Sequence, residues 1–349
     1  MIERLFYVLA KGTNPYENLA LEEVVLKNLP QKSCVLYLWQ NAKTVVIGKN
    51  QNPWLECKSA ELTNDGGFLA RRISGGGAVF QDMGNLNFTF LTSQKDYDVD
   101  KQLSVISEAI KTFGITVEKS GRNDLLIDSK KFSGNAFCKY GSNAYHHGTI
   151  MVNIDLSMLS KYLNVSLKKL QSNSVKSVKS RVTNLKEFIP EITVDMMKES
   201  LLGAFSQVYG LKLEELPSSV TPHEQLVKTT EKYASWEWIF GRKLKCDVEV
   251  ENRFTWGGIQ MQFCIAGGII EECSVYSDAM NCDFITSIPE LLKGCKFNGI
   301  SIANALTKKD LSHLNNKVFD RFDNATFEQS SMIKDLSNWI ATHESIGFR

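Results

Sequence analysis

The first 50 residues contain apolar runs at two different spacings, which predict one helix followed by two strands. In 13–30 (TNPYENLALEEVVLKNLP) the apolar residues recur at helical intervals, with Asn14 as a capping residue and Pro15 at the first helical position. The runs 34–39 (CVLYLW) and 44–48 (TVVIG) are short and apolar, and a polar turn separates them. This pattern is typical of buried strands.

Two further pairs of runs predict hairpins. Residues 78–80 (AVF) and the alternating run 86–91 (LNFTFL) lie on either side of a polar turn. The runs 124–128 (DLLID) and 130–137 (KKFSGNAF) are joined through Ser129. Because each pair is short and closely linked, we expect each to form two antiparallel strands.

Helical periodicity returns at 100–114 and at 195–209. In the first of these segments the apolar residues lie on one helical face, and Asp100 and Gly114 are the expected caps. A further strand is expected at 148–156 (GTIMVNIDL). The chain up to this point therefore mixes strands and helices in one domain.

The amino-acid composition of the chain changes at 166–185 and again at 235–245. Segment 166–185 is rich in serine and lysine and is expected to be a loop. Segment 235–245 contains two tryptophans, and we expect the domain boundary after it, giving domains 1–245 and 246–349. The second domain is predicted to have strands within 246–277 and helices at 287–294, 300–307 and 326–342.

Length, composition and charge narrow the class of protein. A chain of 349 residues with 43% hydrophobic and 23% charged residues is typical of about two globular domains. Its 40 basic and 39 acidic residues leave a formal net charge of +1, so no global field favours nucleic acid or an anionic membrane. No apolar run suits a signal peptide or a membrane span. The eight cysteines lack CxxC spacing, and we expect a soluble cytoplasmic protein with reduced thiols.

Three consecutive glycines in 71–82 (RRISGGGAVFQD) suggest a ligand that approaches the backbone closely. Gly75–Gly77 leave backbone N–H groups accessible to an anion. The two preceding arginines supply positive charge, and Val79 and Phe80 supply an apolar floor, which together suit a nucleotide. The alternative is a tight bend into a strand, and the run matches neither a Walker A loop nor GxGxxG.

Two polar groups further along the chain have the chemistry to contact a phosphate. Asn123 and Asp124 begin a strand and offer the oxygen ligands that Mg²⁺ prefers, although an ordinary turn uses the same residues. Lys130 and Lys131 precede the small pair 133–134, so a lysine there could reach a phosphate or carboxylate as a point charge. The alternative for these lysines is simple solvation.

The adjacent His146 and His147 are expected on opposite faces of a strand, because successive side chains alternate. That arrangement does not suit chelation of one metal ion, and no other Cys or His motif completes a site. We therefore expect one histidine to line a pocket and the other to face outward.

The order of these motifs resembles the lipoate–protein ligase A family. The resemblance covers nearly the whole chain and is densest in 1–245. The stretches that carry it are LALEE, LWQNAKTVVIGKNQNPWLEC, RRISGGGAVFQDMGNLNFTFL, SGRNDLLID, KFSGNAF, YHHGTIMVNIDLSMLSKYL, SVKSVKSRVTNL, SWEW and RFTWGG.

The resemblance implies both a fold and an activity. The implied fold is α/β (α+β): a mixed β-sheet with flanking helices, similar to biotin protein ligases, plus a small C-terminal α/β accessory domain. The implied reaction uses ATP and Mg²⁺ to convert lipoate to lipoyl-AMP and pyrophosphate. The lipoyl group then passes to one lysine of a lipoyl-domain acceptor, as in 2-oxoacid dehydrogenase complexes or the glycine cleavage H protein.

The resemblance also implies roles for individual residues. Lys131 would be the catalytic cation between the lipoyl carboxyl group and the α-phosphate, with Arg72 assisting it, and Asp124 would bind Mg²⁺. The residues implied for ATP and the adenylate are Arg72, Gly75, Gly76, Gly77, Ala78, Val79, Phe80, Asn85, Asn123, Asp124, Lys131 and Lys179. Those implied for lipoate are Trp39, Arg72, Ser74, Lys131, His147 and Thr149.

Two further features bear on this interpretation. Segment 172–185, which includes Lys179, resembles the segment that covers the adenylate in the family. Gln81 stands where the family usually has histidine after GGGAVF. Glutamine keeps a donor and an acceptor but does not titrate, so the change is harmless at a structural position and matters at one that transfers a proton.

Several alternatives remain at the level of sequence. An acyltransferase of the same superfamily would move lipoyl or octanoyl groups without ATP and would need a cysteine, and Cys138 is the only one near the expected site. Its neighbours do not resemble the transferases' cysteine motif. A biotin ligase is disfavoured because a GRGR-type loop is missing. A non-catalytic binding protein, or an enzyme that only transfers preformed lipoyl-AMP, would share most of the same residues.

Overall fold

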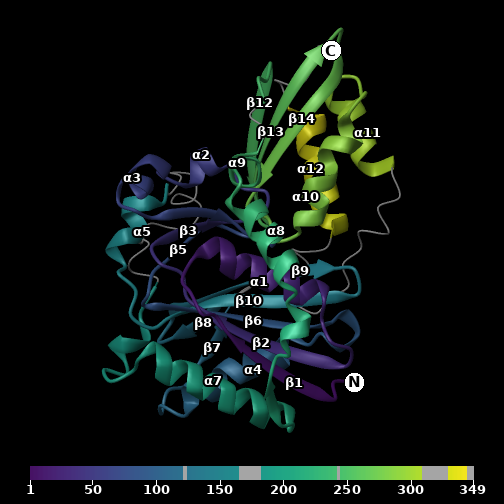
Figure 1. Cartoon of the computed structure of the whole chain (residues 1–349). Coiled ribbons are helices and arrows are strands. Elements are labelled where there is room, and N and C mark those ends of the chain that lie inside the picture. Colours follow the sequence, from purple (N-terminus) through teal and green to yellow (C-terminus); the bar gives the residue numbers. More distant parts are fainter. Residues whose placement is uncertain (121–123, 165–181, 242–243, 309–328, 344–349) are drawn as a thin grey trace. The chain divides into compact units, whose positions relative to one another are not determined.

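The computed structural model of the chain describes residues 1–120, 124–164, 182–241, 244–308 and 329–343 (Figure 1). Contacts between backbones divide the chain into two units. The first comprises 1–47, 53–72 and 78–239; the second comprises 48–52, 73–77 and 240–349.

The first unit is built on an eight-stranded mixed sheet, which confirms the predicted fold class. Its order is β11 (Leu213–Glu215), β1 (Arg4–Leu9), β2 (Ser33–Trp39), β6 (Asn85–Ser93), β10 (Asn143–Met151), β9 (Lys130–Tyr140), β8 (Asp124–Ile127) and β7 (Glu118–Ser120). The strand β1 pairs in parallel with β11 and with β2, whereas all the other pairs are antiparallel.

Helices cover both faces of this sheet, with α1 (Pro15–Lys27) on one face and α4 (Val99–Lys111) and α7 (Val194–Tyr209) on the other (Figure 1). The predicted cap of α1 is confirmed, because the Asn14 side chain accepts a hydrogen bond from the Tyr16 N–H at 2.9 Å. The expected cap of α4 was wrong. Asp98, which has an extended backbone, accepts from the Lys101 N–H, and Asp100 lies inside the first turn.

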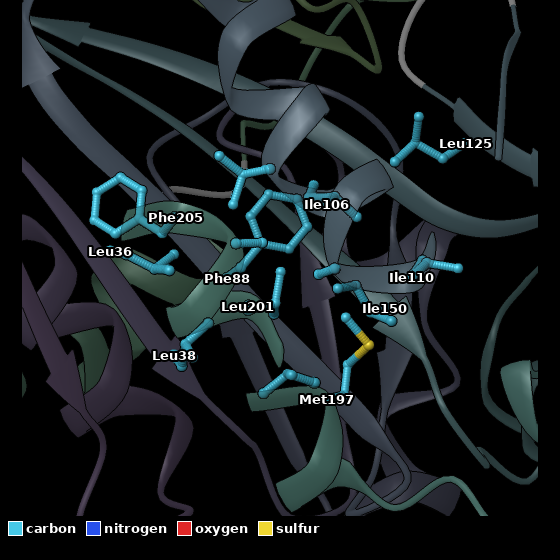
Figure 2. Packing of buried hydrophobic residues seen from close by; sticks show 14 of the residues in the cluster. Leu36, Leu38, Phe88, Ile106, Ile110, Leu125, Ile150, Met197, Leu201 and Phe205 are labelled. Carbon is cyan, nitrogen blue, oxygen red and sulfur yellow. The ribbon is translucent and has the colours of Figure 1, made fainter. Parts of the chain in front are cut away.

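The main hydrophobic core lies between the sheet and the pair α4 and α7 (Figure 2). Alternate residues of β2 and β6, including Leu36 and Phe88, point into it and meet Ile106 of α4 and Leu201 of α7. Each such side chain is fully buried, which contributes about 1.5–3 kcal/mol to folding. The opposite face of the same strands is polar, and it is the face that concerns function.

The predicted hairpin of 78–80 with 86–91 was wrong. The strand β5 (Val79–Gln81) belongs to a separate three-stranded sheet, in the order β4 (Phe68–Arg71), β3 (Thr44–Ile47) and β5. The turn between β5 and β6 redirects the chain, because the Asp82 carboxylate accepts from the N–H groups of Gly84 and Asp155. The chain therefore passes from one sheet into another.

The second predicted hairpin is confirmed, since β8 and β9 are antiparallel neighbours. Its two-residue turn has Asp128 at φ 49° and Ser129 at φ 63°, both in the left-handed region. The expected strand at 148–156 was misplaced. After β9, a turn with Gly141 at φ 56° starts β10 earlier than predicted, at Asn143.

The other helices among the described residues of the first unit are shorter or peripheral. They are α2 (Pro53–Glu56), α3 (Ser59–Asn64), α5 (Ser157–Tyr162), α8 (His223–Ala234) and α9 (Trp236–Phe240), the last of which ends in the second unit. In α9, Trp238 donates to the Arg71 carbonyl while the Arg71 guanidinium donates to the carbonyls of Trp238 and Ile239. One of the two tryptophans at the expected boundary therefore docks onto β4.

The second unit has a small antiparallel sheet with helices on one face. The elements are β12 (Val248–Phe254), β13 (Gly257–Ala266), β14 (Ile269–Ser277), α10 (Cys282–Leu292), α11 (Gly299–Lys308) and α12 (Gln329–Ala341). Alternate residues of β13, such as Met261 and Phe263, are buried against the helices. The helix α10 begins before the predicted residue 287, because the Asn281 side chain caps it by accepting from the Phe284 N–H.

Candidate active site

Strand register places several of the implied site residues in one transverse row on the polar face of the large sheet. Directly opposed residues on neighbouring strands point to the same face. The row consists of Trp39 (β2), Asn87 (β6), Thr149 (β10), Gly134 (β9) and Asp124 (β8). The adjacent row on the same face consists of Tyr37, Thr89, His147 and Ala136.

Lys131 joins this face through an irregularity in β9. Leu125 is opposite Ser133 and Leu126 is opposite Lys131, so Phe132 is an extra residue and forms a β-bulge. Without the bulge, Lys131 and Gly134 would point to opposite faces, because strand side chains alternate. The extra residue brings the two onto one face.

The ammonium group of Lys131 lies beside a carboxylate. Its Nζ is 2.7 Å from Oδ1 of Asp124, and about one third of each side chain is exposed. The Lys131 carbonyl accepts a hydrogen bond from the Thr183 N–H at 2.9 Å, which ties β9 to the segment that begins at Val182. The structure thus brings together Lys131, Asp124 and Thr149, three residues that the sequence had only implied separately.

Trp39 and His147 are joined by a buried chain of hydrogen bonds. The Trp39 indole donates to the Thr89 hydroxyl at 3.2 Å, and that hydroxyl donates to Oε1 of Glu22 at 2.7 Å. His147 Nδ1 lies 2.8 Å from the same Glu22 oxygen. Glu22 comes from α1 and is only 1% exposed. The carboxylate therefore orients the indole and the imidazole together.

Glu22 is a residue that sequence reasoning missed. The motif LALEE contributes to the family resemblance as a whole and implies no role for either glutamate. The available signal was a pair of acidic residues inside an apolar helical stretch, since a carboxylate at a buried position needs a partner. The second glutamate, Glu23, has partners of its own: it accepts from Lys27, Lys232 and Tyr233.

The expectation that the second histidine faces outward was wrong. The two histidines do point to opposite faces, but His146 is fully buried on the side of the hydrophobic core. Its Nε2 lies 2.8 Å from Oδ1 of Asn135, and its Nδ1 lies 3.1 Å from the side-chain amide of Gln102. Burial, followed by the nearby His147 and Lys119, lowers the His146 pKa to about 3. The ring is therefore neutral at physiological pH.

Several of the residues that are implied for the adenylate in the first unit have buried side chains. Arg72 is 6% exposed and donates to the Val46 carbonyl at 3.2 Å. Phe80 packs against Tyr162, with ring centroids 5.6 Å apart. Ala78 and Val79 are partly buried.

Asn85 belongs to a buried chain of amides that includes Gln81. The Asn85 amide donates to Asn87 at 2.9 Å, and the Asn87 amide donates to Oε1 of Gln81 at 3.3 Å. From the other side, Asn18 donates to Asn41, which donates to the same Gln81 oxygen at 2.8 Å. All five side chains are buried. Gln81 thus serves as an acceptor for two donors.

The glycine run lies in the second unit, where protein backbone approaches it closely. Gly76 has φ 88°, and its N–H donates to the Ala279 carbonyl at 3.2 Å. A Cβ added to Gly75 would lie 2.5 Å from that carbonyl oxygen and 2.7 Å from the oxygen of Met280. Next to the run, the carbonyl of the implied lipoate residue Ser74 accepts from the Lys49 N–H. The bare backbone is therefore used for packing against 279–280.

Two of the implied site residues are not among the residues that the structure describes. Asn123 and Lys179 lie outside the described residues, as does all of segment 172–185 except its last four positions. Within the described ranges, no group of three or more His, Cys, Asp or Glu side chains is arranged to bind a metal ion. All eight cysteines, Cys138 included, are free thiols, as expected.

Comparisons with known proteins point to the same family as the sequence motifs. The model of the "Lipoyl protein ligase A/B catalytic domain" matches residues 14–206, and that of the "Bacterial lipoate protein ligase C-terminus" matches residues 243–338. A curated relative, the lipoate-protein ligase A of Psychrobacter cryohalolentis, is 38% identical over 336 residues. That alignment covers 94% of this chain and 95% of the relative.

Solved structures share the fold. LipL1 of P. falciparum, crystallised in complex with lipoate, superposes with a TM-score of 0.81 at 26% identity and covers 97% of this chain and 99% of its own. A bipartite lipoate protein ligase from Thermoplasma acidophilum, solved in work on its E2 lipoyl domain, has a TM-score of 0.61 at 26% identity. It covers 71% of this chain and all of its own. No described helix is long and apolar enough to cross a membrane.

Proposed function

We infer that this chain, which belongs to the lipoate–protein ligase A family, activates lipoate with ATP and transfers the lipoyl group to a lysine of a lipoyl domain. The observation in the structure that carries this inference is the Lys131 ammonium, held 2.7 Å from Asp124 on the polar face of the sheet. A reaction between two anions requires a positive charge held in place to offset their repulsion, and the Lys131 ammonium can supply it.

The chemistry has two steps. In the first, a lipoate carboxylate oxygen attacks the α-phosphorus of ATP, an O–P bond forms, and pyrophosphate leaves. In the second, the amine of the acceptor lysine attacks the lipoyl carbonyl, an amide forms, and AMP leaves with the electron pair of the broken C–O bond. Lys131 neutralises the carboxylate and the phosphate as they meet, so positioning and charge account for most of the catalysis.

The transverse row suggests how lipoate lies in the site. We assign the lipoate tail to Trp39, His147 and Thr149, because all three side chains lie on the polar face and the buried Glu22 fixes the first two. Its carboxylate would then reach Lys131 beyond Thr149. Arg72, Gly75–Gly77, Ala78–Phe80 and Asn85 remain the proposed contacts of the adenylate, and Ser74 remains a proposed contact of lipoate.

Asp124 also has the chemistry of a Mg²⁺ ligand. It offers a carboxylate that is one third exposed, and magnesium is often held by one or two protein carboxylates together with substrate phosphates. When bound, the ion would shield the phosphate charges. Asp124 would then hold the ion, and Lys131 beside it would neutralise the lipoate carboxylate.

The acceptor protein and the roles of the two domains are proposed because the chain belongs to this family. We propose that catalysis resides in 1–245 and that 246–349 is an accessory domain. The expected acceptors are the lipoyl domains of 2-oxoacid dehydrogenase complexes and the glycine cleavage H protein.

The direct test uses purified protein with ATP, Mg²⁺, lipoate and a lipoyl domain. We expect pyrophosphate release together with a lipoyl-sized gain in the mass of the acceptor, and loss of both in Lys131→Ala. Lys130→Ala is the matched control, since Lys130 is the neighbouring lysine and pairs with Glu187 at 3.9 Å instead. Modification that occurs only from supplied lipoyl-AMP would contradict the activation step. Loss of transfer in Cys138→Ala would favour a cysteine-dependent transferase.

A further inference from the structure

The transverse row has a gap at Gly134, between Thr149 and Asp124. Any larger residue there would direct a side chain onto the polar face. A Cβ built on Gly134 would lie 2.9 Å from both Cε and Nζ of Lys131, and 4.0 Å from Oγ1 of Thr149. The end of the Lys131 side chain therefore occupies the volume that a residue at 134 would otherwise fill.

Two features of β9 bring Lys131 into this gap. The bulge at Phe132 turns Lys131 onto the same face as Gly134, three residues further along the strand. The hydrogen bond from the Thr183 N–H fixes the Lys131 backbone. With the backbone held, the volume over Gly134 decides where the ammonium group lies.

We propose that Gly134 is a positioning residue, which keeps the Lys131 ammonium in the row beside Asp124 and Thr149. This inference rests on the proposed function, in which Lys131 neutralises the lipoate carboxylate and the α-phosphate. A methyl group at 134 collides only with the far end of a flexible side chain. The fold can therefore accept it, while the ammonium must move away from the place where the two substrates meet.

The first test compares Gly134→Ala with Gly203→Ala. Gly203 lies in α7, and an added Cβ there would have nothing within 4 Å. We expect lipoyl-AMP formation by Gly134→Ala to fall about 100-fold in kcat, because misplacing a catalytic group by about 1 Å has this order of effect. Gly203→Ala should stay within about twofold, and both variants should keep a cooperative urea transition. Full activity in Gly134→Ala would overturn the proposal.

A double-mutant cycle separates positioning from general damage. In a Lys131→Ala background there is no ammonium to displace, so adding Gly134→Ala should change the residual rate by less than about twofold. A further loss as large as the one in the wild-type background would mean that Gly134 acts through the fold. That result would also overturn the proposal.

A third readout needs no catalysis. Acetic anhydride labels exposed amines, and peptide mass spectrometry gives the labelling of Lys131 relative to Lys130 in the same strand. Loss of the Asp124 ion pair in Gly134→Ala should raise this ratio by about fivefold, the effect expected of a weak ion pair. If the wild type formed no lipoyl-AMP, the proposed function would fail, and the labelling ratio alone would decide. An unchanged ratio would show that Gly134 does not set the position of Lys131.

Discussion

Gln81 stands where the resemblance implies a histidine, and its contacts define what the side chain does in this chain. Its Oε1 accepts hydrogen bonds from the side-chain amides of both Asn41 and Asn87, and the residue is only 4% exposed. An acceptor for two donors does not need to titrate. The position is therefore structural here, and it orients Asn85 through Asn87.

Replacing this acceptor should cost stability. Gln81→Leu leaves two buried N–H donors without an acceptor, and we expect the free energy of unfolding to fall by about 3 kcal/mol. Urea unfolding measures the change. Gln207→Leu, at an exposed position of α7, serves as the control and should change the free energy by less than about 0.5 kcal/mol. Equal effects of the two variants would show that the amide chain contributes nothing.

Single residues also show which parts of the candidate site could be predicted from the sequence. The implied residues Lys131, Asp124 and Thr149 lie together in the structure, whereas Glu22 had no assigned role. The reason is physical, because a buried carboxylate acquires its role only from partners on other elements. Those partners are Thr89 and His147, which are 67 and 125 residues away along the chain.

At the scale of elements, the turn of the β8–β9 hairpin carries a testable strain. Ser129 has φ 63°, a conformation that costs an L-residue about 1 kcal/mol and glycine almost nothing. We expect Ser129→Gly to raise the free energy of unfolding by about 0.5–1 kcal/mol. The same replacement at Ser107, inside α4, should lower it by about 1 kcal/mol. If both replacements destabilised equally, Ser129 would not be strained.

The two predicted hairpins show what local pattern can and cannot decide. The β8–β9 hairpin was predicted correctly because its two strands are joined by only two residues, and so short a link favours antiparallel pairing of the strands that it joins. The hairpin of 78–80 with 86–91 was wrong, because Asp82 binds the N–H groups of Gly84 and Asp155 and turns the chain into another sheet. One of those contacts joins residues 73 apart along the sequence, where no local pattern can indicate it.

At the scale of the whole molecule, the register of strands that are distant in sequence could not be predicted from the sequence. The motifs implied Trp39, Thr149 and Asp124 one by one, and only the strand register places these three residues in one row. The glycine run approaches Ala279 and Met280 within the second unit, a contact about 200 residues away along the chain that no local pattern indicates. Long-range packing of this kind depends on the complete fold.

The stability of the whole molecule should fall in acid because of His146. Its pKa is about 3 in the folded chain, against an ordinary value of 6.5. Between these values the unfolded chain binds a proton that the folded chain does not, so the free energy of unfolding decreases as the pH falls below 6.5. From pH 7 to pH 5 this contributes a loss of about 2 kcal/mol. The stability contributed by the neutral ring is thus fully present only above about pH 6.5.

Urea unfolding at pH 5, 6 and 7 isolates this contribution. His146→Gln keeps an N–H donor for Oδ1 of Asn135 or Oε1 of Gln102 but has no titratable group, so its stability should fall less between pH 7 and pH 5, by about 2 kcal/mol. His223→Gln, at an exposed position of α8, should retain the full dependence on pH of the wild type. Parallel curves for the wild type and His146→Gln would mean that the buried ring takes up a proton without unfolding. The acid sensitivity of the fold would then have to come from its carboxylates, such as Glu23, whose pKa is raised by burial but lowered overall by hydrogen bonds from Lys232, Lys27 and Tyr233.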